Sequence, residues 1–214
     1  MGRQKNILII GNGEDYTLKK INDLINNTDC IIAADGGLKI LDELKTCPDF
    51  IIGDSDSCPA ELLNKYEHIK TITYKPEKNY TDSELAIKKA LEIGAKNIYL
   101  AAVTGNYLDH SLANIYNLCK YRKPDLSMTI ITGNSQIFPI FTEKKFKNIK
   151  DRRFSLIPLT PVKGLYMEGC KYQFPQNNIG QFMYGISNIF TSSQSIIKLE
   201  QGILICILFD MGFM

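Results

Sequence analysis

Apolar residues in the first part of the chain form short runs, and the segments between these runs place apolar residues three or four positions apart. The runs span residues 5–11, 30–35, 49–54, 69–74 and 96–103. The intervening segments span residues 17–25, 37–45, 59–66, 81–93 and 109–121. Such spacing is typical of amphipathic helices, and runs without polar alternation are typical of strands covered on both faces. The pattern therefore predicts a parallel sheet between two layers of helices, a three-layer α/β domain.

The pattern changes after residues 123–125, where apolar runs are separated by Gly, Pro and Asn and no helical repeat remains. The strand candidates in this part are residues 127–132, 136–141, 153–159, 164–169, 181–190, 195–200 and 202–209. Short strands bounded by turn residues predict an antiparallel β-sandwich or small barrel. We therefore expect two domains, an α/β domain over residues 1–128 and a β-rich domain over residues 129–214.

Composition narrows the classes of function. The 25 Lys and Arg against 23 Asp and Glu leave a net charge of +2, which is too balanced for a nucleic-acid-binding surface. The apolar runs are shorter than the roughly 20 residues that a membrane span needs, so we expect a cytoplasmic protein. The six cysteines lack metal-binding spacing and are expected to be reduced. With only two histidines in the chain, its chemistry must depend mainly on carboxylates.

Carboxylates are concentrated where the predicted strands end. Five aspartates follow these strands or begin the next helix, namely Asp35, Asp54, Asp56, Asp82 and Asp109. In an open parallel sheet, ligands bind beyond the carboxyl ends of the strands, so these side chains are expected to converge. Clustered like charges cost stability unless a cation neutralises them, and oxygen ligands shared with phosphates are the usual environment of Mg²⁺. The sequence therefore predicts a magnesium–nucleotide site.

Glycines next to these aspartates support a phosphate site, because a residue without a side chain lets backbone N–H groups approach phosphate oxygens. Gly36 and Gly37 follow Asp35, and Thr104 and Gly105 follow the fifth predicted strand. The Gly-Asn-Gly sequence at 11–13 lacks the rest of a dinucleotide-binding motif, so a simple turn explains it better.

Each aspartate also has a simpler structural explanation. Asp35 and Asp109 could cap the helices that follow them, and Asp82 could be a first-turn acid that complements a helix dipole. His110 could likewise serve as a helix cap or bind phosphate. The pair Asp54 and Asp56 is harder to explain as a turn, since alternate residues of an extended segment point the same way. The case for a site depends on the convergence of all five carboxylates.

Five motifs occur in the order and approximate spacing of the thiamine pyrophosphokinases. They are "ADGG" (34–37), "PDFIIGDSDS" (48–57), "TDSELA" (81–86), "TGNYLDHSLANI" (104–115) and "GISN" (185–188). The chain thus resembles this family over nearly its whole length. The resemblance implies an enzyme that transfers pyrophosphate from ATP to the thiamine hydroxyl, with Mg²⁺ as cofactor, giving thiamine diphosphate and AMP. It also implies a homodimer whose active site lies between the α/β domain of one subunit and the β domain of the other.

The resemblance also assigns residues to roles. As catalytic Mg²⁺ ligands it implies Asp54, Asp56 and Asp82. For ATP it implies Asp35, Gly36, Gly37, Thr104, Gly105, Asp109 and His110. For thiamine it implies Ser187, Asn188 and Phe190, where Phe190 is equally well explained as a core residue of the β domain.

Two positions depart from the family pattern. Tyr107 stands where the family commonly has an Arg, and Asn79 stands where it often has an acid. Arg offers a permanent charge and a two-pronged hydrogen-bond donor that Tyr cannot replace. Two other functions therefore remain open, a different Mg²⁺-dependent phosphotransferase or phosphohydrolase and a nucleotide- or thiamine-binding protein without turnover.

Overall fold

A computed structural model describes residues 5–53, 56–73 and 80–211 of the chain. Its residues form two units, Met1–Gly133 and Asn134–Met214. The division expected at residues 128/129 falls inside strand β6 (Ser127–Ile131). This strand pairs in parallel with β5 (Asn97–Ala101), so it completes the sheet of unit 1.

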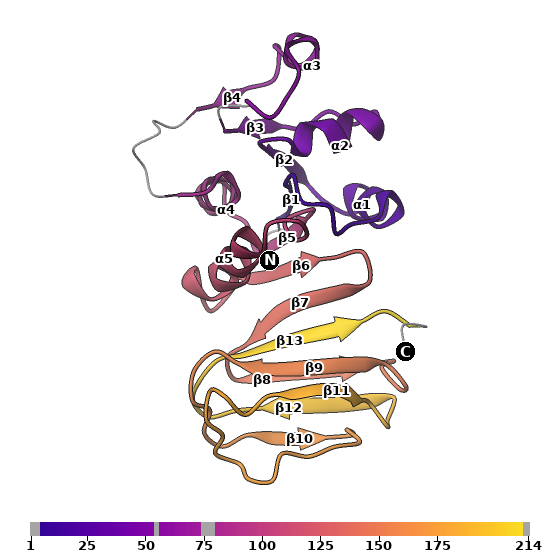
Figure 1. Cartoon of the computed structure of the whole chain (residues 1–214), viewed down its shortest axis with the longest axis vertical. Helices are drawn as coiled ribbons and strands as arrows, with labels where there is room; N and C mark the ends of the chain where they lie inside the picture. The colour runs from indigo at the N-terminus through magenta and orange to yellow at the C-terminus, as the bar shows by residue number, and fades with distance from the viewer. Residues whose placement is uncertain (1–4, 54–55, 74–79, 212–214) are drawn as a thin grey trace. The chain divides into compact units, whose positions relative to one another are not determined.

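Unit 1 contains a parallel sheet with the strand order β6-β5-β1-β2-β3-β4 (Figure 1). The remaining strands are β1 (Asn6–Ile10), β2 (Cys30–Ala34), β3 (Phe50–Ile52) and β4 (Thr71–Ile72). Ile7 to Ile10 of β1 are completely buried, as the unalternated apolar run predicts. The chain builds outward from β1 in one direction through β4 and then in the other through β5 and β6, so the strand order reverses between β1 and β5.

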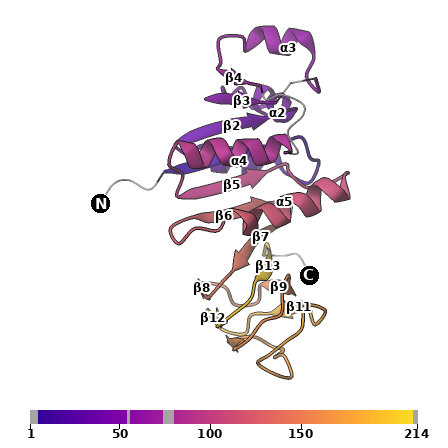
Figure 2. The ribbon, with the colours of Figure 1, turned by 90° about the vertical axis from the view of Figure 1, so that its left-hand side faces the viewer.

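Helices cover both faces of this sheet. They are α1 (Leu18–Ile25), α2 (Gly37–Glu43), α3 (Ala60–Lys65), α4 (Asp82–Glu92) and α5 (Leu108–Lys120). Figures 1 and 2 show α4 and α5 on one face and α1 and α2 on the other. The predicted three-layer α/β fold is confirmed, and the helices begin and end within two residues of the expected positions.

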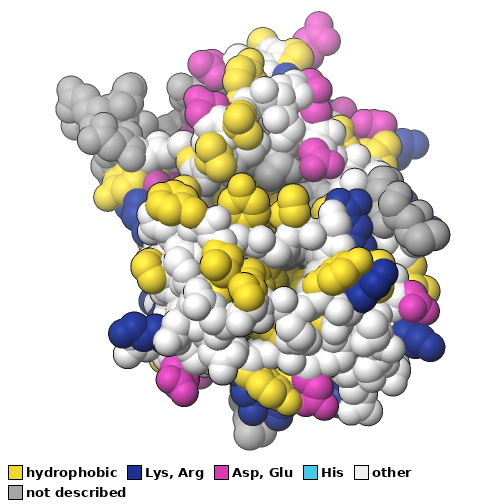
Figure 3. Space-filling view, turned by 60° about the horizontal axis from the view of Figure 1, so that its bottom comes forward, with side chains coloured by type: hydrophobic (Ala, Val, Ile, Leu, Met, Phe, Trp, Pro, Cys, Tyr) yellow, Lys and Arg dark blue, Asp and Glu magenta, His cyan; other side chains and the backbone are white. Residues whose placement is uncertain are grey.

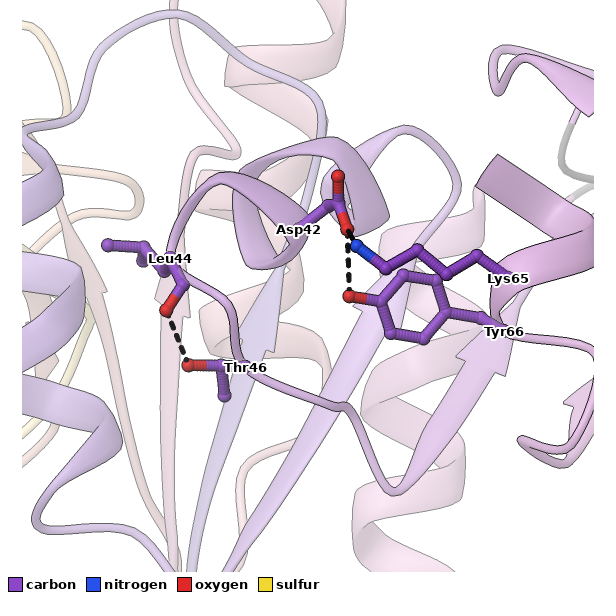
Figure 4. Close-up of polar contacts among 5 residues, drawn as sticks. All are labelled: Asp42, Leu44, Thr46, Lys65 and Tyr66. Atoms are coloured by element: carbon purple, nitrogen blue, oxygen red, sulfur yellow. Dashed lines mark hydrogen bonds and ion pairs between the residues drawn. The ribbon is translucent and has the colours of Figure 1, made fainter. Parts of the chain in front are cut away.

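Helix α2 is held against the end of α3 by a small polar cluster (Figure 4). The carboxylate of Asp42 accepts hydrogen bonds from Lys65 and, at 3.0 Å, from the Tyr66 hydroxyl. The hydrogen bond from Lys65 lowers the pKa of Asp42, and burial raises the pKa of Tyr66 to about 12. The loop that leaves α2 is closed by a 3.2 Å hydrogen bond from Thr46 to the Leu44 carbonyl.

Unit 2 is all-β over its described residues. Its strands are β7 (Ser135–Ile140), β8 (Glu143–Lys147), β9 (Arg153–Pro158), β10 (Tyr166–Glu168), β11 (Gly185–Ile189), β12 (Gln194–Lys198) and β13 (Leu204–Phe209). They form two antiparallel sets, in the orders β11-β9-β13-β7 and β10-β12-β8. Phe154 and Leu156 from the first set pack with Phe146, Met167 and Ile197 from the second in one apolar core. The predicted antiparallel β fold is confirmed as a sandwich.

All six cysteines are free thiols. Cys30, Cys58 and Cys206 are buried, and burial raises the pKa of each. Within the described ranges, no helix combines the length and apolar character needed to cross a membrane.

Candidate active site

A pocket of about 380 Å³ opens in unit 1 at the carboxyl ends of the strands. Its walls come from Gly11–Gly13 after β1, Ala34 and Asp35 at the end of β2, Ser57 after β3, Ala102–Tyr107 after β5, Tyr80–Ser83 at the start of α4, and His110, Ser111 and Asn114 on α5. Because β1 and β5 are the strands between which the order reverses, the pocket lies at the topological switch point of the sheet. Open α/β sheets bind their ligands at this position.

Glycines let the loops around the pocket approach one another. A Cβ atom added to Gly13 would lie 2.3 Å from the Thr104 carbonyl oxygen, and one added to Gly37 would lie 2.0 Å from the Ile10 carbonyl oxygen. A Cβ atom on Gly36 would collide with the Asn12 side chain at 2.3 Å. In this structure Gly36 and Gly37 therefore serve close packing of the strand ends, and they are not among the residues that line the pocket.

Asp35 is held in an unusual backbone conformation at the end of β2, with a φ of 50°. The Ser57 hydroxyl donates to Asp35 Oδ2 at 2.7 Å and lies 3.4 Å from Asp56 Oδ1. Asp35 Oδ1 is buried and has no hydrogen-bond partner among the residues that the structure describes. A buried carboxylate oxygen without a partner is costly, which indicates that it is shaped for a cation or another donor.

Asp82 approaches the end of β3. A Cβ atom added to Gly53, which has a φ of 126°, would lie 3.1 Å from the carboxylate carbon of Asp82. The positive φ favours glycine at position 53, and a Cβ atom there would crowd this carboxylate. Asp54 follows Gly53 in the sequence but lies outside the described residues, as does Asn79. Among the residues described, no three His, Cys, Asp or Glu side chains are close enough to complete a metal site.

Helix α4, which carries Asp82, is anchored at both ends of its first turn. Thr81 accepts a 3.2 Å hydrogen bond from the Glu84 backbone and so caps the N-terminus of this helix. The Glu84 carboxylate does not return to this cap but accepts hydrogen bonds from Lys120 and Tyr121 at the end of α5. Burial acts to raise the pKa of Glu84, but these two hydrogen bonds outweigh it and the pKa is lowered.

The first turn of α5 forms another wall of the pocket. Ser111 accepts a 3.2 Å hydrogen bond from the Gly105 backbone and donates to the Tyr107 carbonyl at 2.9 Å. The rings of Tyr107 and His110 lie 5.6 Å apart, and both residues line the pocket together with Thr104 and Gly105. Asp109 instead accepts a 2.9 Å hydrogen bond from the His110 backbone and is not a lining residue.

The loop after β1 is tied to the other strand ends by Asp15. Its carboxylate accepts hydrogen bonds from the Gly133 backbone at 2.9 Å and from the Thr104 hydroxyl at 3.4 Å. The Asp15 backbone N–H also donates to the Thr104 carbonyl at 3.1 Å. Asp15 therefore positions the wall that contains Thr104 and Gly105, although no motif in the sequence points to it.

Ser187 and Asn188 lie on β11 in unit 2, where the pairing with β9 shifts register. Ser187 has a φ of 60° and accepts a 3.0 Å hydrogen bond from Arg153. The Asn188 side chain is bound to the backbone of Tyr172, donating at 2.8 Å and accepting at 3.1 Å. Left-handed backbone at a non-glycine residue often marks a functional site, and Ser187 shares this feature with Asp35.

Phe190 is fully buried in the core of unit 2. Its ring lies 4.1 Å from that of Phe154 and 4.9 Å from that of Phe146. No exposed face of the ring is left to stack on a ligand. The structure therefore corrects the implied substrate contact and favours the alternative explanation of Phe190 as a core residue.

Two protein-family models match the chain. The catalytic-domain model of thiamin pyrophosphokinase matches residues 21–130, about half of the chain. This chain belongs to the thiamin pyrophosphokinase family. The vitamin B1 binding-domain model of thiamin pyrophosphokinase matches residues 140–204. The resemblance drawn from the five motifs is confirmed, and so is the predicted enzymatic function, thiamine diphosphokinase.

Relatives match this thiamin pyrophosphokinase sequence along almost its whole length. The thiamine pyrophosphokinase of Bacillus subtilis (strain 168) is 29% identical over 212 residues, which cover 95% of this chain and 98% of the relative. A crystal structure of the Bacillus subtilis protein superimposes with a TM-score of 0.83 at 27% identity, covering 96% of this chain and 99% of that one. Thiamin pyrophosphokinase from Geobacillus thermodenitrificans gives a TM-score of 0.83 at 25% identity, covering 97% and 99%.

Several residues at this thiamin pyrophosphokinase pocket are absent from the sequence-based assignment. They include Asn12, Ser57, Tyr80, Ser111 and Asn114. Helical spacing could have identified Ser111 and Asn114, since they follow Tyr107 and His110 at intervals of four on α5. Ser57 has no such signal, because its hydrogen bond to Asp35 joins two different strand ends.

Proposed function

We propose that the pocket of unit 1 binds ATP and Mg²⁺ and is the place where pyrophosphate is transferred to thiamine, releasing AMP. The observation that carries this assignment is Asp35, which sits at the switch point of the sheet with one buried oxygen unpartnered within the described part of the chain. Asp56, which approaches the same Ser57 hydroxyl, and Asp82, which lies against Gly53, offer further hard oxygen atoms. Hard oxygen atoms around an anion-binding pocket are suited to Mg²⁺ and nucleotide phosphates.

We assign the Mg²⁺ ligands to Asp56 and Asp82, with Asp35 beside them and Asp54, which lies outside the described residues, as the third family ligand. Support comes from the 3.4 Å approach of Ser57 to Asp56, from its hydrogen bond to Asp35, and from the position of Asp82 against Gly53. When bound, the ion supplies charge neutralisation on the phosphate oxygens.

The protein contributes mainly position to the reaction. The thiamine oxygen attacks the β-phosphorus in line, the bond from that phosphorus to the α,β-bridging oxygen breaks to release AMP, and the hydroxyl proton passes to a nearby carboxylate or to water. Both α4 and α5 begin at the pocket, and the N-termini of helices favour anions through their free N–H groups and dipoles. Thr104 and His110 line the pocket, which supports their assignment to ATP.

We further propose that unit 2 binds thiamine, that Ser187 contributes to its site, and that the chain acts as a homodimer in the cytoplasm. Large apolar side chains are exposed on the surface (Figure 3). On unit 2 they gather at and before β11, where Phe182, Tyr184 and Ile186 are 84%, 59% and 62% exposed. Because β11 is the edge strand of its sheet, these side chains support a contact with a second subunit.

One assay separates the proposed function from its alternatives. The purified protein is incubated with ATP, MgCl₂ and thiamine, and the nucleotide products are separated and quantified. We expect AMP and thiamine diphosphate in equal amounts. Formation of ADP or free phosphate would instead identify another phosphotransferase or a phosphohydrolase, and thiamine binding without any product would identify a binding protein.

The metal assignment is tested with Asp82→Asn. Neutralising this carboxylate is expected to lower turnover roughly 100-fold or more, because a bound metal ion contributes several kcal/mol to such reactions. The increase in melting temperature that ATP and Mg²⁺ together produce should also disappear. Asp23→Asn on the exposed side of α1 is the matched control and should behave as the wild type. Normal Mg²⁺-dependent turnover in Asp82→Asn would remove Asp82 from the metal site.

The dimer is tested by light scattering and by dilution. If two subunits form each site, the specific activity should fall in step with the fraction of dimer. A specific activity that stays constant as the protein becomes monomeric would contradict a shared site.

A further inference from the structure

Asn114, on the second turn of α5, is a buried side chain of the pocket wall with one polar atom unused. It is 4% exposed, and its Nδ2 donates a 2.8 Å hydrogen bond to the Val103 carbonyl. This bond fixes the orientation of the amide, since a flipped side chain would place two oxygen atoms against each other. Asn114 Oδ1 then has no hydrogen-bond partner in the described part of the chain. The pocket wall therefore holds a fixed acceptor whose donor is missing from the described residues.

The neighbours of Asn114 suit a flat aromatic ligand. His110 precedes it by four positions on the same helix, and both residues line the pocket. Aromatic side chains of this kind stack on any nucleobase, because every base has a flat π face. Carboxylates, by contrast, gather at the ends of β2 and β3. The side of the pocket at His110 and Asn114 is therefore the one for a base, and the carboxylate side, together with the helix N-termini, is the one for phosphates.

We propose that Asn114 determines the nucleotide specificity of the enzyme, because its Oδ1 accepts a hydrogen bond from the exocyclic amine of adenine. This inference rests on the proposed function of the pocket. The required donor, the amine of a 4-aminopyrimidine ring, occurs both in adenine and in thiamine. Adenine is favoured because Asn114 lies within residues 21–130, which match the catalytic domain, whereas the vitamin B1 binding domain matches residues 140–204.

The proposal predicts that purine nucleotides bind with different affinities. A 6-oxo purine, as in ITP or GTP, would place an acceptor against Asn114 Oδ1, and an unsubstituted purine would leave that oxygen unpaired. A lost hydrogen bond of this kind corresponds to roughly tenfold in affinity. The wild-type protein should therefore bind ATP about tenfold more tightly than purine riboside triphosphate, and ITP should bind more weakly still.

The experiment measures binding of ATP, purine riboside triphosphate and ITP to the full chain by calorimetry in the presence of MgCl₂, and turnover of thiamine with each nucleotide. Asn114→Leu removes the acceptor and keeps a similar side-chain volume. This variant should therefore bind ATP and purine riboside triphosphate with about equal affinity. Asn117→Leu is the matched control, because Asn117 is buried at 5% exposure one turn further along α5 and does not line the pocket. It should keep the wild-type preference. If Asn114→Leu does not fold, equal binding of ATP and purine riboside triphosphate by the wild-type protein would still overturn the proposal.

Each outcome has a definite meaning. Equal affinity of the wild type for ATP and purine riboside triphosphate would overturn the proposal and assign Asn114 Oδ1 to a buried water. A preference for thiamine over its 4-oxo analogue that depends on Asn114, without a preference among purines, would also overturn it and identify thiamine as the donor. If no nucleotide supports thiamine turnover but Asn114 still governs the binding of ATP over purine riboside triphosphate, the proposed function fails and the inference about Asn114 stands.

Discussion

Glu84 connects the two helices that form the pocket walls, and replacing it with Gln tests the electrostatic account of that connection. The Glu84 side chain is 8% exposed and accepts hydrogen bonds from Tyr121 and Lys120. Glu84→Gln keeps the size of the side chain and one acceptor oxygen but removes the charge. Lys120 is 53% exposed, so its ion pair contributes little in solvent, about 0–1 kcal/mol.

The bond from Tyr121 carries most of the effect. A hydrogen bond to a charged group contributes about 1.5–3 kcal/mol, roughly twice the contribution of a neutral one. Converting Glu84 to Gln should therefore lower the free energy of unfolding by about 1.5 kcal/mol. For a chain of this length, that loss corresponds to a decrease in melting temperature of roughly 3–6 °C.

The loss must depend on pH in a definite direction. Because the pKa of Glu84 is lowered below its usual value of 4.5 in the folded protein, the ionised carboxylate stabilises the fold above pH 4.5. This stabilisation decreases as the pH falls through the lower, folded-state pKa, where both states become protonated. The difference between the wild type and Glu84→Gln should therefore be complete at pH 7 and shrink below pH 4.5.

The measurement is urea unfolding of both proteins, followed by circular dichroism at a series of pH values. Glu92→Gln is the matched control, because Glu92 lies on the same helix, pairs with Lys89 and is 67% exposed. This control should change stability by no more than about 0.5 kcal/mol. A difference for Glu84→Gln that stays constant with pH, or one as small as that of the control, would refute the electrostatic account.

Three further predictions concern the strand ends and the core. Gly37→Ala would place a Cβ atom 2.0 Å from the Ile10 carbonyl oxygen and should lower the free energy of unfolding in urea by more than about 2 kcal/mol. Gly180→Ala, where the added atom has no neighbour within 4 Å, should change it by no more than about 0.5 kcal/mol. Equal losses in the two variants would contradict the packing role of Gly37. Tyr107→Arg restores the charged donor common in the family and should raise kcat/KM for ATP several-fold in steady-state kinetics, while an unchanged value would show that Tyr107 is not near the phosphates. Phe190→Leu should lower stability by about 1–2 kcal/mol without changing KM for thiamine, and a raised KM at normal stability would return Phe190 to the substrate site.

The hydrophobic pattern was sufficient for most of the fold because most strands and helices of unit 1 are buried as their own sequences require, with α3 and β4 as the elements without a buried residue. Strand β8 escaped prediction, since its sequence is mostly charged and only Phe146 is buried. The position of β6 was also not decided by its pattern, because a short apolar strand reads the same in a parallel or an antiparallel sheet. Pairing with β5 is a tertiary property, so it becomes visible only in the structure.

The site was predictable to the extent that its residues follow strand ends. Asp35 and Thr104 line the pocket as expected from parallel strands, whose carboxyl ends meet at one edge. Asp15 was not predictable, because its bonds to Thr104 and Gly133 join loops that are far apart in the sequence. The same holds for the burial of the Phe190 ring by two other phenylalanines, which depends on how two sheets face each other.

Asp35 carries a cost that a purely structural residue would not need. With a φ of 50°, position 35 has a left-handed backbone that glycine adopts without strain, whereas a non-glycine residue there loses about 1 kcal/mol of stability. Asp35→Gly would relieve this strain and remove the unpaired carboxylate oxygen at the same time. A laboratory selection for thermal stability alone would thus be expected to discard this aspartate, and a selection for growth that depends on the enzyme would be expected to retain it. At position 35, the residue that favours stability therefore differs from the residue that activity requires.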